Sequence, residues 1–410
     1  MLRDDIERVL RNRHQRDGYL FPAYDDYCFG NVPDTVHSVL GAGGRRSLPN
    51  DVFEGVDTAV DTVLLVLIDG FGLKAWKRHH RRCDVLARLT DDGTVTPLTS
   101  IYPSETGAAI TTLETGRLPC EHGRIGWNVY EPQIDTTFLA LGGAVKTGAS
   151  EDDVVGESVA GCEYHYPQMS DAGIDCHRLQ PFDNRGSDVI HHTYDDLDSF
   201  GERLSAVVAG SDDPGYIYAY VPHVDHVSHA EGTDSVAYGN TVATVCEQIA
   251  DCIERIDERT AERTLLLVTA DHGHVNTDPD RNIDLSANST VMANLRQHAN
   301  RTPVKMAGSP RNVHLHLREG TVSETRRALS DYDARIFTRQ EALDRNLFGD
   351  RPATDRFRRR CGDLVVTHRK LGMWFGDVEP DELSLVGMHG GLNPAEMLVP
   401  FAAARVSTLV

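Results

Sequence analysis

Acidic and histidine side chains follow each of three short apolar runs in this chain. They are Asp69 after residues 63–68, Asp225 and His229 after residues 216–221, and Asp271 and His272 after residues 264–269. Each run has the length and composition of a buried strand in a parallel sheet. The carboxyl ends of such strands face one crevice, and that crevice is where ligands bind. Three separate segments therefore direct carboxylates and imidazoles, which are typical metal ligands, to one place.

The strength of this pattern lies in its repetition, because no single segment is specific. An Asp-Gly pair after a strand is more often a simple turn than part of a metal site. A single Asp-His pair is equally weak evidence for a metal site. If the chain becomes helical after the second run, Asp225 and His229 share a helix face through their i, i+4 spacing. His226 then points elsewhere and is the expected decoy. His274 could touch a bound substrate, but its position predicts no definite role.

Thr106 stands near the start of a predicted helix over residues 106–114. Pro103 interrupts the preceding structure and Ser104 is a candidate N-cap, so Thr106 falls within the first turn. A hydroxyl there can be stabilised as an alkoxide by the helix dipole and the free backbone N–H groups, which also attract phosphate. Metal coordination would lower its pKa further. Without the carboxylates and histidines, residues 104–106 would be interpreted as no more than a helix cap.

His389 lies in a glycine-rich stretch near the end of the chain, between Gly387 and the pair Gly390-Gly391. Glycines allow the backbone to approach a ligand closely. A lone loop histidine is usually only solvated, so His389 gains its weight from the other segments.

The alternation of apolar runs with amphipathic stretches predicts an α/β fold with a mostly parallel sheet and helices on both faces. Further helices are expected over residues 195–208 and 235–259. We expect residues 1–60 to form a lead-in packed on the core. The catalytic core would comprise 61–299 and 386–410, and residues 300–385 would form an inserted α+β cap subdomain. Its basic cluster, Arg356 and Arg358 to Arg360, is either an anion contact or, as we prefer, a solvated face.

Composition narrows the class of protein. The chain has 410 residues, with 62 acidic against 41 basic ones, and a net charge of −21. This charge disfavours sequence-independent binding to nucleic acid or to an anionic membrane. Aspartate outnumbers glutamate about two to one and lysine is rare, which is typical of a halophilic surface.

Eight scattered cysteines without a CxxC pair suggest buried reduced thiols. Because no apolar run could form a signal peptide or cross a bilayer, we expect a cytoplasmic protein without membrane contact.

With these segments identified, the chain resembles the type I phosphodiesterase and nucleotide pyrophosphatase family of the alkaline phosphatase superfamily. The matching stretches, in the family's order, are LIDGFG, YPSETGAAITTLETGRLPCEHGRIGWNVYEP, DHVSHAEG, VTADHG and GMHGGLNPAEMLVPF. The resemblance covers roughly residues 60–280 and 386–401. It implies an alkaline-phosphatase-like fold and a metal-dependent hydrolase that acts on a small phosphoester, for example a nucleotide.

The resemblance also implies two metal sites. One would be formed by Asp69, Thr106, Asp271 and His272, and the other by Asp225, His229 and His389. Mixed carboxylate and imidazole ligands suit two zinc ions, with manganese as the alternative. Thr106 would attack phosphorus to give a phosphothreonine intermediate, and water at the second metal would then hydrolyse it.

The sequence departs from the family just after the nucleophile. Nucleotide pyrophosphatases place an Asn downstream of the nucleophilic Thr to contact the phosphoryl oxygen, whereas Gly107 and the two alanines that follow it have no such side chain. The contact would then come from the backbone N–H groups near Thr106 and Gly107, or from another side chain such as Asn128.

Three other functions remain open from the sequence. A phosphomonoesterase or phosphomutase of the same superfamily could use the same ligands with a different pocket. A non-catalytic metal- or phosphate-binding protein could retain the ligands in a degenerate site, although all the expected metal-contacting residues are present. A sulfatase is weaker still, because such enzymes need a Cys or Ser in a modification motif at the nucleophile position.

Overall fold

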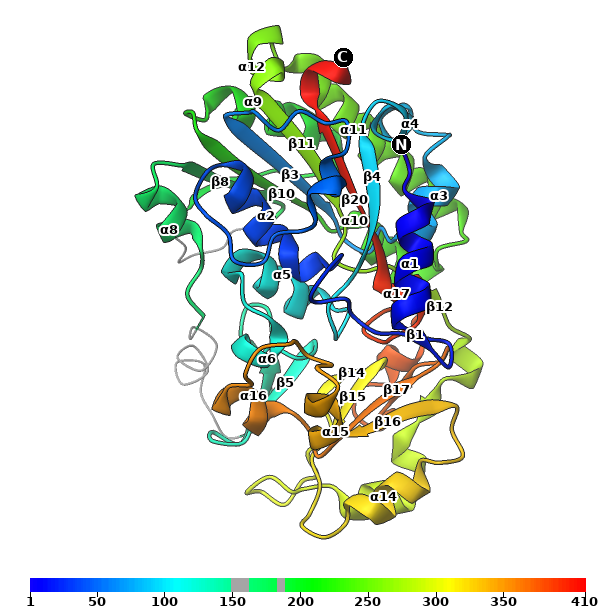
Figure 1. Cartoon of the computed structure of the whole chain (residues 1–410). Coiled ribbons are helices and arrows are strands. Elements are labelled where there is room, and N and C mark those ends of the chain that lie inside the picture. Colours follow the sequence, from blue (N-terminus) through cyan, green and yellow to red (C-terminus); the bar gives the residue numbers. More distant parts are fainter. Residues whose placement is uncertain (149–161, 183–188) are drawn as a thin grey trace.

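The computed structural model describes residues 1–148, 162–182 and 189–410 of the chain. Figure 1 shows a larger sheet in the upper half of the view and a smaller sheet in the lower half. The helix α5 (Thr106–Thr115) and the short helix α17 (Pro394–Met397) lie between the two sheets.

The larger sheet has the strand order β4-β20-β11-β3-β10-β8-β9. Its strands are β3 (Thr62–Ile68), β4 (Thr94–Thr99), β8 (Asp175–Gln180), β9 (Ile190–Thr193), β10 (Gly215–Val221), β11 (Thr264–Thr269) and β20 (Leu398–Arg405). Strand β20 is antiparallel to both of its neighbours, β4 and β11, and the other described strands of this sheet all run in one direction. Every residue of β3, β10 and β11 is buried, because helices cover both faces of the sheet. In Figure 1, α2 lies in front of this sheet and α9 and α11 lie behind it.

The helices that accompany these strands are α1 (Asp4–His14), α2 (Val32–Val39), α3 (Leu73–His79), α4 (Asp84–Asp91), α6 (Pro119–His122), α8 (Tyr166–Asp171), α9 (Phe200–Gly210), α10 (His223–Glu231), α11 (Val236–Arg255) and α12 (Glu258–Arg263). The predicted strands agree with β3, β10 and β11 to within one residue. The predicted helix 106–114 is α5, and the predicted helix 195–208 corresponds to a 3₁₀ turn followed by α9.

The prediction of one long helix over residues 235–259 is wrong. The chain leaves the helical conformation at Ile256, and the side chain of Asp257 accepts a hydrogen bond from the Thr260 N–H to cap a new helix, α12. A carboxylate at this position stabilises a fresh N-terminus, which the apolar periodicity alone does not reveal.

The smaller sheet has the order β16-β17-β15-β14-β5-β6-β7. Its strands are β5 (Asn128–Glu131), β6 (Thr136–Leu139), β7 (Val145–Gly148), β14 (Gly308–Ser309), β15 (Asn312–Leu315), β16 (Ala334–Thr338) and β17 (Leu364–His368), with helices α13 (Ser289–Asn294), α14 (Val322–Ala328), α15 (Arg339–Asp344) and α16 (Asp355–Arg360) alongside. The chain therefore enters this sheet twice: β5 to β7 come from the segment after α5, and β14 to β17 from the predicted insert. The boundaries of the insert stay a prediction.

The basic cluster in the insert is not a uniform solvated face. Arg360 is buried and pairs with Glu131 at 2.9 Å, and Arg359 pairs with the same carboxylate at 3.3 Å. Only Arg358 is exposed, while Arg356 is half-buried. The preferred interpretation is therefore wrong for Arg360, whose charge serves to pair with a strand of the smaller sheet.

The N-terminal residues pack along the outer edge of the larger sheet. The Arg3 N–H donates to the Val95 carbonyl and the Thr99 N–H donates to that of Tyr27, so the lead-in covers the edge strand β4.

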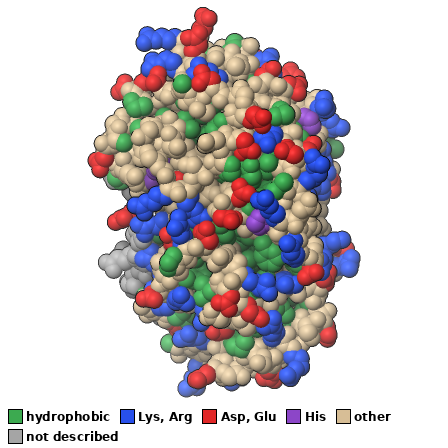
Figure 2. All heavy atoms as spheres, in the orientation of Figure 1, with side chains coloured by type: hydrophobic (Ala, Val, Ile, Leu, Met, Phe, Trp, Pro, Cys, Tyr) green, Lys and Arg blue, Asp and Glu red, His purple; other side chains and the backbone are tan. Residues whose placement is uncertain are grey.

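All eight cysteines are free and buried, as predicted. Within the described residues, no helix combines the length and apolar character needed to cross a bilayer. In Figure 2, acidic and basic side chains are interspersed over the visible face.

Candidate active site

The three predicted strands are neighbours in the larger sheet and end at the same level. Ile68 of β3 is paired with Val221 of β10, and Leu67 of β3 is paired with Thr269 of β11. The residues that follow these strands therefore start from one edge, as the carboxyl ends of parallel strands must. The structure brings all seven predicted ligand residues to this edge, in two adjoining groups.

The first group, which we call the threonine cluster, consists of Asp69, Thr106, Asp271 and His272. Thr106 is the first residue of α5, so its hydroxyl lies at the helix N-terminus. Its Oγ1 lies 3.1 Å from Nε2 of His272 and 3.4 Å and 3.5 Å from the two carboxylate oxygens of Asp69. The same Nε2 lies 3.4 Å from a carboxylate oxygen of Asp271. All four side chains are buried.

The predicted N-cap of this helix is wrong. The residue before Thr106 is Glu105, which precedes the helix without a side-chain cap. Ser104 instead donates through its hydroxyl to the Gly391 carbonyl at 2.8 Å. The segment before Thr106 is therefore hydrogen-bonded to the glycine-rich loop that carries His389.

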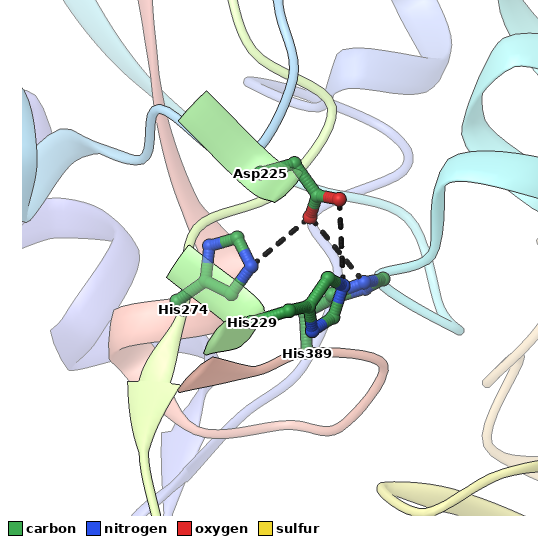
Figure 3. Close-up of side chains that lie close together, drawn as sticks. All are labelled: Asp225, His229, His274 and His389. Carbon is green, nitrogen blue, oxygen red and sulfur yellow. Dashed lines mark ion pairs between the residues drawn. The ribbon is translucent and has the colours of Figure 1, made fainter. Parts of the chain in front are cut away.

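The second group, the histidine cluster, consists of Asp225, His229, His274 and His389 (Figure 3). Asp225 and His229 lie one turn apart on α10, as predicted, and His226 is exposed on another face. The carboxylate of Asp225 lies 3.4 Å from His229, 3.0 Å from His274 and 3.6 Å from His389. The two-stranded pairing of β12 (Val275–Asn276) with β19 (Gly387–Met388) places the last two histidines side by side.

Hydrogen bonds to Nδ1 orient two histidines of the histidine cluster. Nδ1 of His229 lies 2.8 Å from the Gly387 carbonyl, and Nδ1 of His389 lies 3.0 Å from the Ser104 carbonyl. This leaves Nε2 of each ring directed at the carboxylates, an arrangement typical of metal-binding histidines. The rings of His272 and His389 stack with centroids 3.7 Å apart and planes inclined by 7°, so the two clusters adjoin.

The carboxylates are held in an unfavourable electrostatic setting. Burial and the charges of Asp271 and Asp225 raise the pKa of Asp69 well above its usual range. Burial and the charge of Asp225 raise the pKa of Asp271 to about 7. Within the described residues, the ion pairs of these three aspartates are all to histidines, never to Lys or Arg. Such a group of buried carboxylates needs positive charge from another source.

Two of the histidines are neutral, which is the form that binds a metal ion. Burial lowers the pKa of His272 to about 3 and that of His389 well below its usual range, so both are neutral at pH 7. His229 differs: burial would lower its pKa, but the carboxylate of Asp225 raises it to about 9. Burial alone would raise the pKa of Asp225, yet the charge of His229 lowers it well below its usual range.

The donor atoms fit divalent cations in both clusters. Oδ2 of Asp271 is buried and has no hydrogen-bond partner among the described residues, so one oxygen is free to bind an ion. Ligand atoms of Asp69, Asp271 and His272 lie within 4.8 Å of one another, and so do those of the histidine cluster. Carboxylate oxygens combined with imidazole nitrogens are the donors that zinc and manganese take in proteins.

The structure adds two residues that the sequence did not assign. His274 joins the histidine cluster, its Nε2 3.0 Å from Asp225. Tyr220, the last aromatic residue of β10, donates its hydroxyl to Oδ2 of Asp69. The second D-H-G-H histidine was the available signal for His274. Tyr220 lies inside a fully apolar strand, where nothing in the pattern distinguishes it from its neighbours.

The two predicted substrate residues lie close to the start of α5. Gly107 is the second residue of that helix, and a Cβ at this position would lie 3.0 Å from the Cβ of Ala140. Asn128 begins β5 and is paired with Leu139, the residue before Ala140. The hairpin of β5 and β6 therefore brings Asn128 towards the first turn of the helix. Oδ1 of Asn128 is buried without a hydrogen-bond partner in the described part of the chain.

Substituting Tyr220 tests how much its hydrogen bond matters. Tyr220→Phe keeps the ring but releases Oδ2 of Asp69, so we expect the affinity for one metal ion to fall by about tenfold, as for other partners of metal ligands. Metal titration of the purified protein measures this. Tyr218→Phe is the matched control, because Tyr218 is buried on the same strand and its hydroxyl has no hydrogen-bond partner among the described residues. Equal effects of the two substitutions would contradict the role of Tyr220.

The larger sheet, with its clusters beyond the carboxyl ends of the strands, defines an alkaline-phosphatase-like α/β protein. Residues 63–392 match the family model of type I phosphodiesterases and nucleotide pyrophosphatases. The chain belongs to this family, as the sequence motifs predicted.

Individual proteins are similar to this chain in sequence or in structure. An uncharacterized pyrophosphatase/phosphodiesterase of the fission yeast Schizosaccharomyces pombe is 24% identical over 242 residues, which cover 55% of this chain and 47% of that protein. The chain thus spans about half the length of this curated relative. Murine ectonucleotide pyrophosphatase/phosphodiesterase 5 superposes with a TM-score of 0.61 at 20% identity, covering 83% of this chain and 87% of the other. An inactive variant of the murine protein in complex with AMP gives 0.62 at 19% identity, covering 84% and 88%.

Proposed function

We propose that this protein is a metal-dependent hydrolase of phosphodiesters that acts through Thr106. The observation that carries the proposal is the position of the Thr106 hydroxyl. It lies at the N-terminus of α5, between 3.1 Å and 3.5 Å from His272 and Asp69, and beside a second carboxylate–histidine cluster. A hydroxyl next to two metal-type ligands at a helix N-terminus is placed to become a nucleophile and to meet a phosphoryl group.

Two divalent ions, zinc or alternatively manganese, complete this site. Asp69, Thr106, Asp271 and His272 would hold one ion, and Asp225, His229 and His389 the other. When bound, the ions would neutralise the phosphoryl oxygens and lower the pKa of the Thr106 hydroxyl. His274 lies against Asp225 and would fix the orientation of that carboxylate.

The reaction then follows from the residues. Oγ1 of Thr106 attacks phosphorus, the P–O bond to one alcohol breaks, and that alcohol leaves with a proton. Thr106 now carries the phosphoryl group together with its remaining ester substituent. Water attacks phosphorus in the second step, breaks the bond to Oγ1 and restores the threonine hydroxyl. The backbone N–H of Gly107 and the side chain of Asn128 would donate to the phosphoryl oxygens and replace the contact missing after Thr106.

We expect the substrate to be a small phosphoester, for example a nucleotide ester. The inactive variant of the murine protein is in complex with AMP, which supports a nucleotide as the substrate here. A phosphomonoesterase would use the same residues with less room for a second ester group. Hydrolysis of a bis-aryl phosphodiester compared with an aryl phosphomonoester, on protein reconstituted with zinc or manganese, distinguishes the two. We expect the diester to be the better substrate; a clear preference for the monoester would favour the alternative.

The acidic surface leads to a prediction about salt. Molar salt shortens the Debye length to about 3 Å and thereby relieves repulsion among the exposed carboxylates. The threonine cluster is buried and the histidine cluster is partly buried, so their attraction for cations and phosphate is screened less. We expect kcat/KM to persist or rise as potassium chloride increases to molar concentration. Activity that is full in dilute buffer and lost in molar salt would contradict a salt-adapted surface.

A further inference from the structure

A buried ion pair joins a turn of the smaller sheet to the short helix that precedes β20 of the larger sheet. Arg311 lies in the turn between β14 and β15, and Glu396 lies in α17, just before β20. Nε and Nη2 of the arginine donate to the two carboxylate oxygens at 2.9 Å and 2.7 Å. Both side chains are 0% exposed. A two-pronged pair of this kind fixes direction as well as distance.

The carboxylate of Glu396 also shapes the loop that follows His389. Its Oε1 accepts from the Gly391 N–H and its Oε2 from the Asn393 N–H, each at 3.0 Å. The loop has no room for a side chain at Gly391. A Cβ on Gly391 would lie 2.8 Å from a Thr367 side-chain oxygen and 3.1 Å from both Arg311 and Glu396.

The same loop holds His389 in place. Its Nδ1 lies 3.0 Å from the Ser104 carbonyl, and the Gly390 N–H donates to the Ser104 hydroxyl at 3.2 Å. The backbone of Glu396 reaches the neighbouring segment as well, because its carbonyl accepts from the Gly273 N–H at 2.8 Å. Gly273 stands between His272 and His274. Glu396 therefore contacts the backbone between His272 and His274 and, through Gly391, the backbone two residues after His389.

Arg311 connects Glu396 and its loop to the smaller sheet. Its Nη1 donates to the Leu371 carbonyl at 2.7 Å, which fixes the guanidinium independently of Glu396. Burying an ion pair contributes little net stability, because the lost hydration offsets the attraction. Its geometric effect is larger: the glutamate, and with it the loop, is held at a position set by the strands β14 and β15.

We propose that the Arg311–Glu396 pair is a positioning device that makes the metal affinity of the histidine cluster depend on the smaller sheet. The inference rests on the proposed function, in which His389 holds a metal ion. Loss of the pair would leave all ligands present but allow the His389 loop to move, so one of the two metal ions would bind more weakly.

Cobalt titration of the metal-free protein, followed by visible absorption, tests the inference. We expect the wild type to take up two Co²⁺ ions. Glu396→Gln keeps the shape but removes the charge that Arg311 pairs with. It is expected to bind one ion normally and the second at least about tenfold more weakly, the effect typical of partners of metal ligands.

Glu131→Gln is the matched control, because Glu131 and Arg360 are each 2% exposed and also form a buried pair beside the smaller sheet. It is expected to lower the unfolding temperature without changing either Co²⁺ affinity. If Glu396→Gln fails to fold, Arg311→Lys replaces it, since lysine keeps the charge but cannot make both hydrogen bonds.

Wild-type affinity for both ions in Glu396→Gln, or in Arg311→Lys if that variant is used, would overturn the positioning role. Equal weakening in Glu131→Gln would also overturn it, because the effect would then be general. A wild-type protein that binds fewer than two ions would overturn the two-metal site itself, and the inference with it.

Discussion

Replacing Thr106 with alanine is expected to lower kcat for phosphodiester hydrolysis by at least about a thousandfold, because removal of a nucleophile disables both steps of the reaction. The metal content should stay close to that of the wild type, since Asp69, Asp271 and His272 remain in the threonine cluster. Steady-state kinetics and metal analysis of the same preparation measure both quantities.

Thr106→Ser is the control for this experiment. It keeps a hydroxyl at the start of α5 and should retain most of the activity, with a loss far smaller than that of the alanine variant. Undiminished turnover in Thr106→Ala would rule out Thr106 as the nucleophile. A loss of activity accompanied by the loss of both ions would instead indicate that the substitution disrupts the site as a whole.

Removing one carboxylate of the threonine cluster should have opposite effects on the metal-bound and metal-free protein. In Asp271→Asn one ion loses a ligand, and a loss of about 4 kcal/mol in transition-state stabilisation would reduce kcat/KM about a thousandfold. The metal-free variant should be more stable than the metal-free wild type, because it no longer buries a charged carboxylate beside the charge of Asp225.

The pH dependence of the metal-free protein gives the sign of this effect. The pKa of Asp271 is raised to about 7 in the folded state, against about 3.9 in an unfolded chain. Below pH 4 the carboxyl is protonated in both the folded and the unfolded state, so it does not lower the free energy of unfolding. As the pH rises towards 7, this free energy falls, because the unfolded chain ionises Asp271 more readily than the folded protein does. We expect Asp271→Asn to flatten this decline in thermal unfolding between pH 4 and pH 8.

His226→Ala is the control for the aspartate variant, because His226 stands beside Asp225 in the chain but is exposed. It should leave activity, metal content and the pH profile unchanged. A metal-free Asp271→Asn protein that is less stable than the metal-free wild type at pH 8 would contradict the electrostatic account of the cluster.

Much of this arrangement could be predicted from local features of the sequence. Strands β3, β10 and β11 are short, fully apolar runs, and their carboxyl ends must meet, so the convergence of Asp69, Asp225 and Asp271 follows from topology. The i, i+4 spacing on α10 correctly separated His229 from His226. The family motifs predicted the fold class for the same reason: they hold the residues at the strand ends.

The features that escaped prediction depend on contacts between distant segments. The partners of Arg311 and Arg360 lie 85 and 229 residues away, so neither pair leaves a local signal. The hydrogen bond of Tyr220 to Asp69 joins neighbouring strands and is hidden within an apolar run. The break at Ile256 depends on a single capping carboxylate, which periodicity does not register.

The stereochemistry at phosphorus tests the central claim most directly. A chiral phosphorothioate diester hydrolysed in isotopically labelled water reports whether one or two displacements occur. Each in-line displacement inverts the configuration, so attack by Thr106 followed by attack of water predicts net retention. Net inversion would mean that water attacks the diester directly, and it would contradict the threonine-linked intermediate.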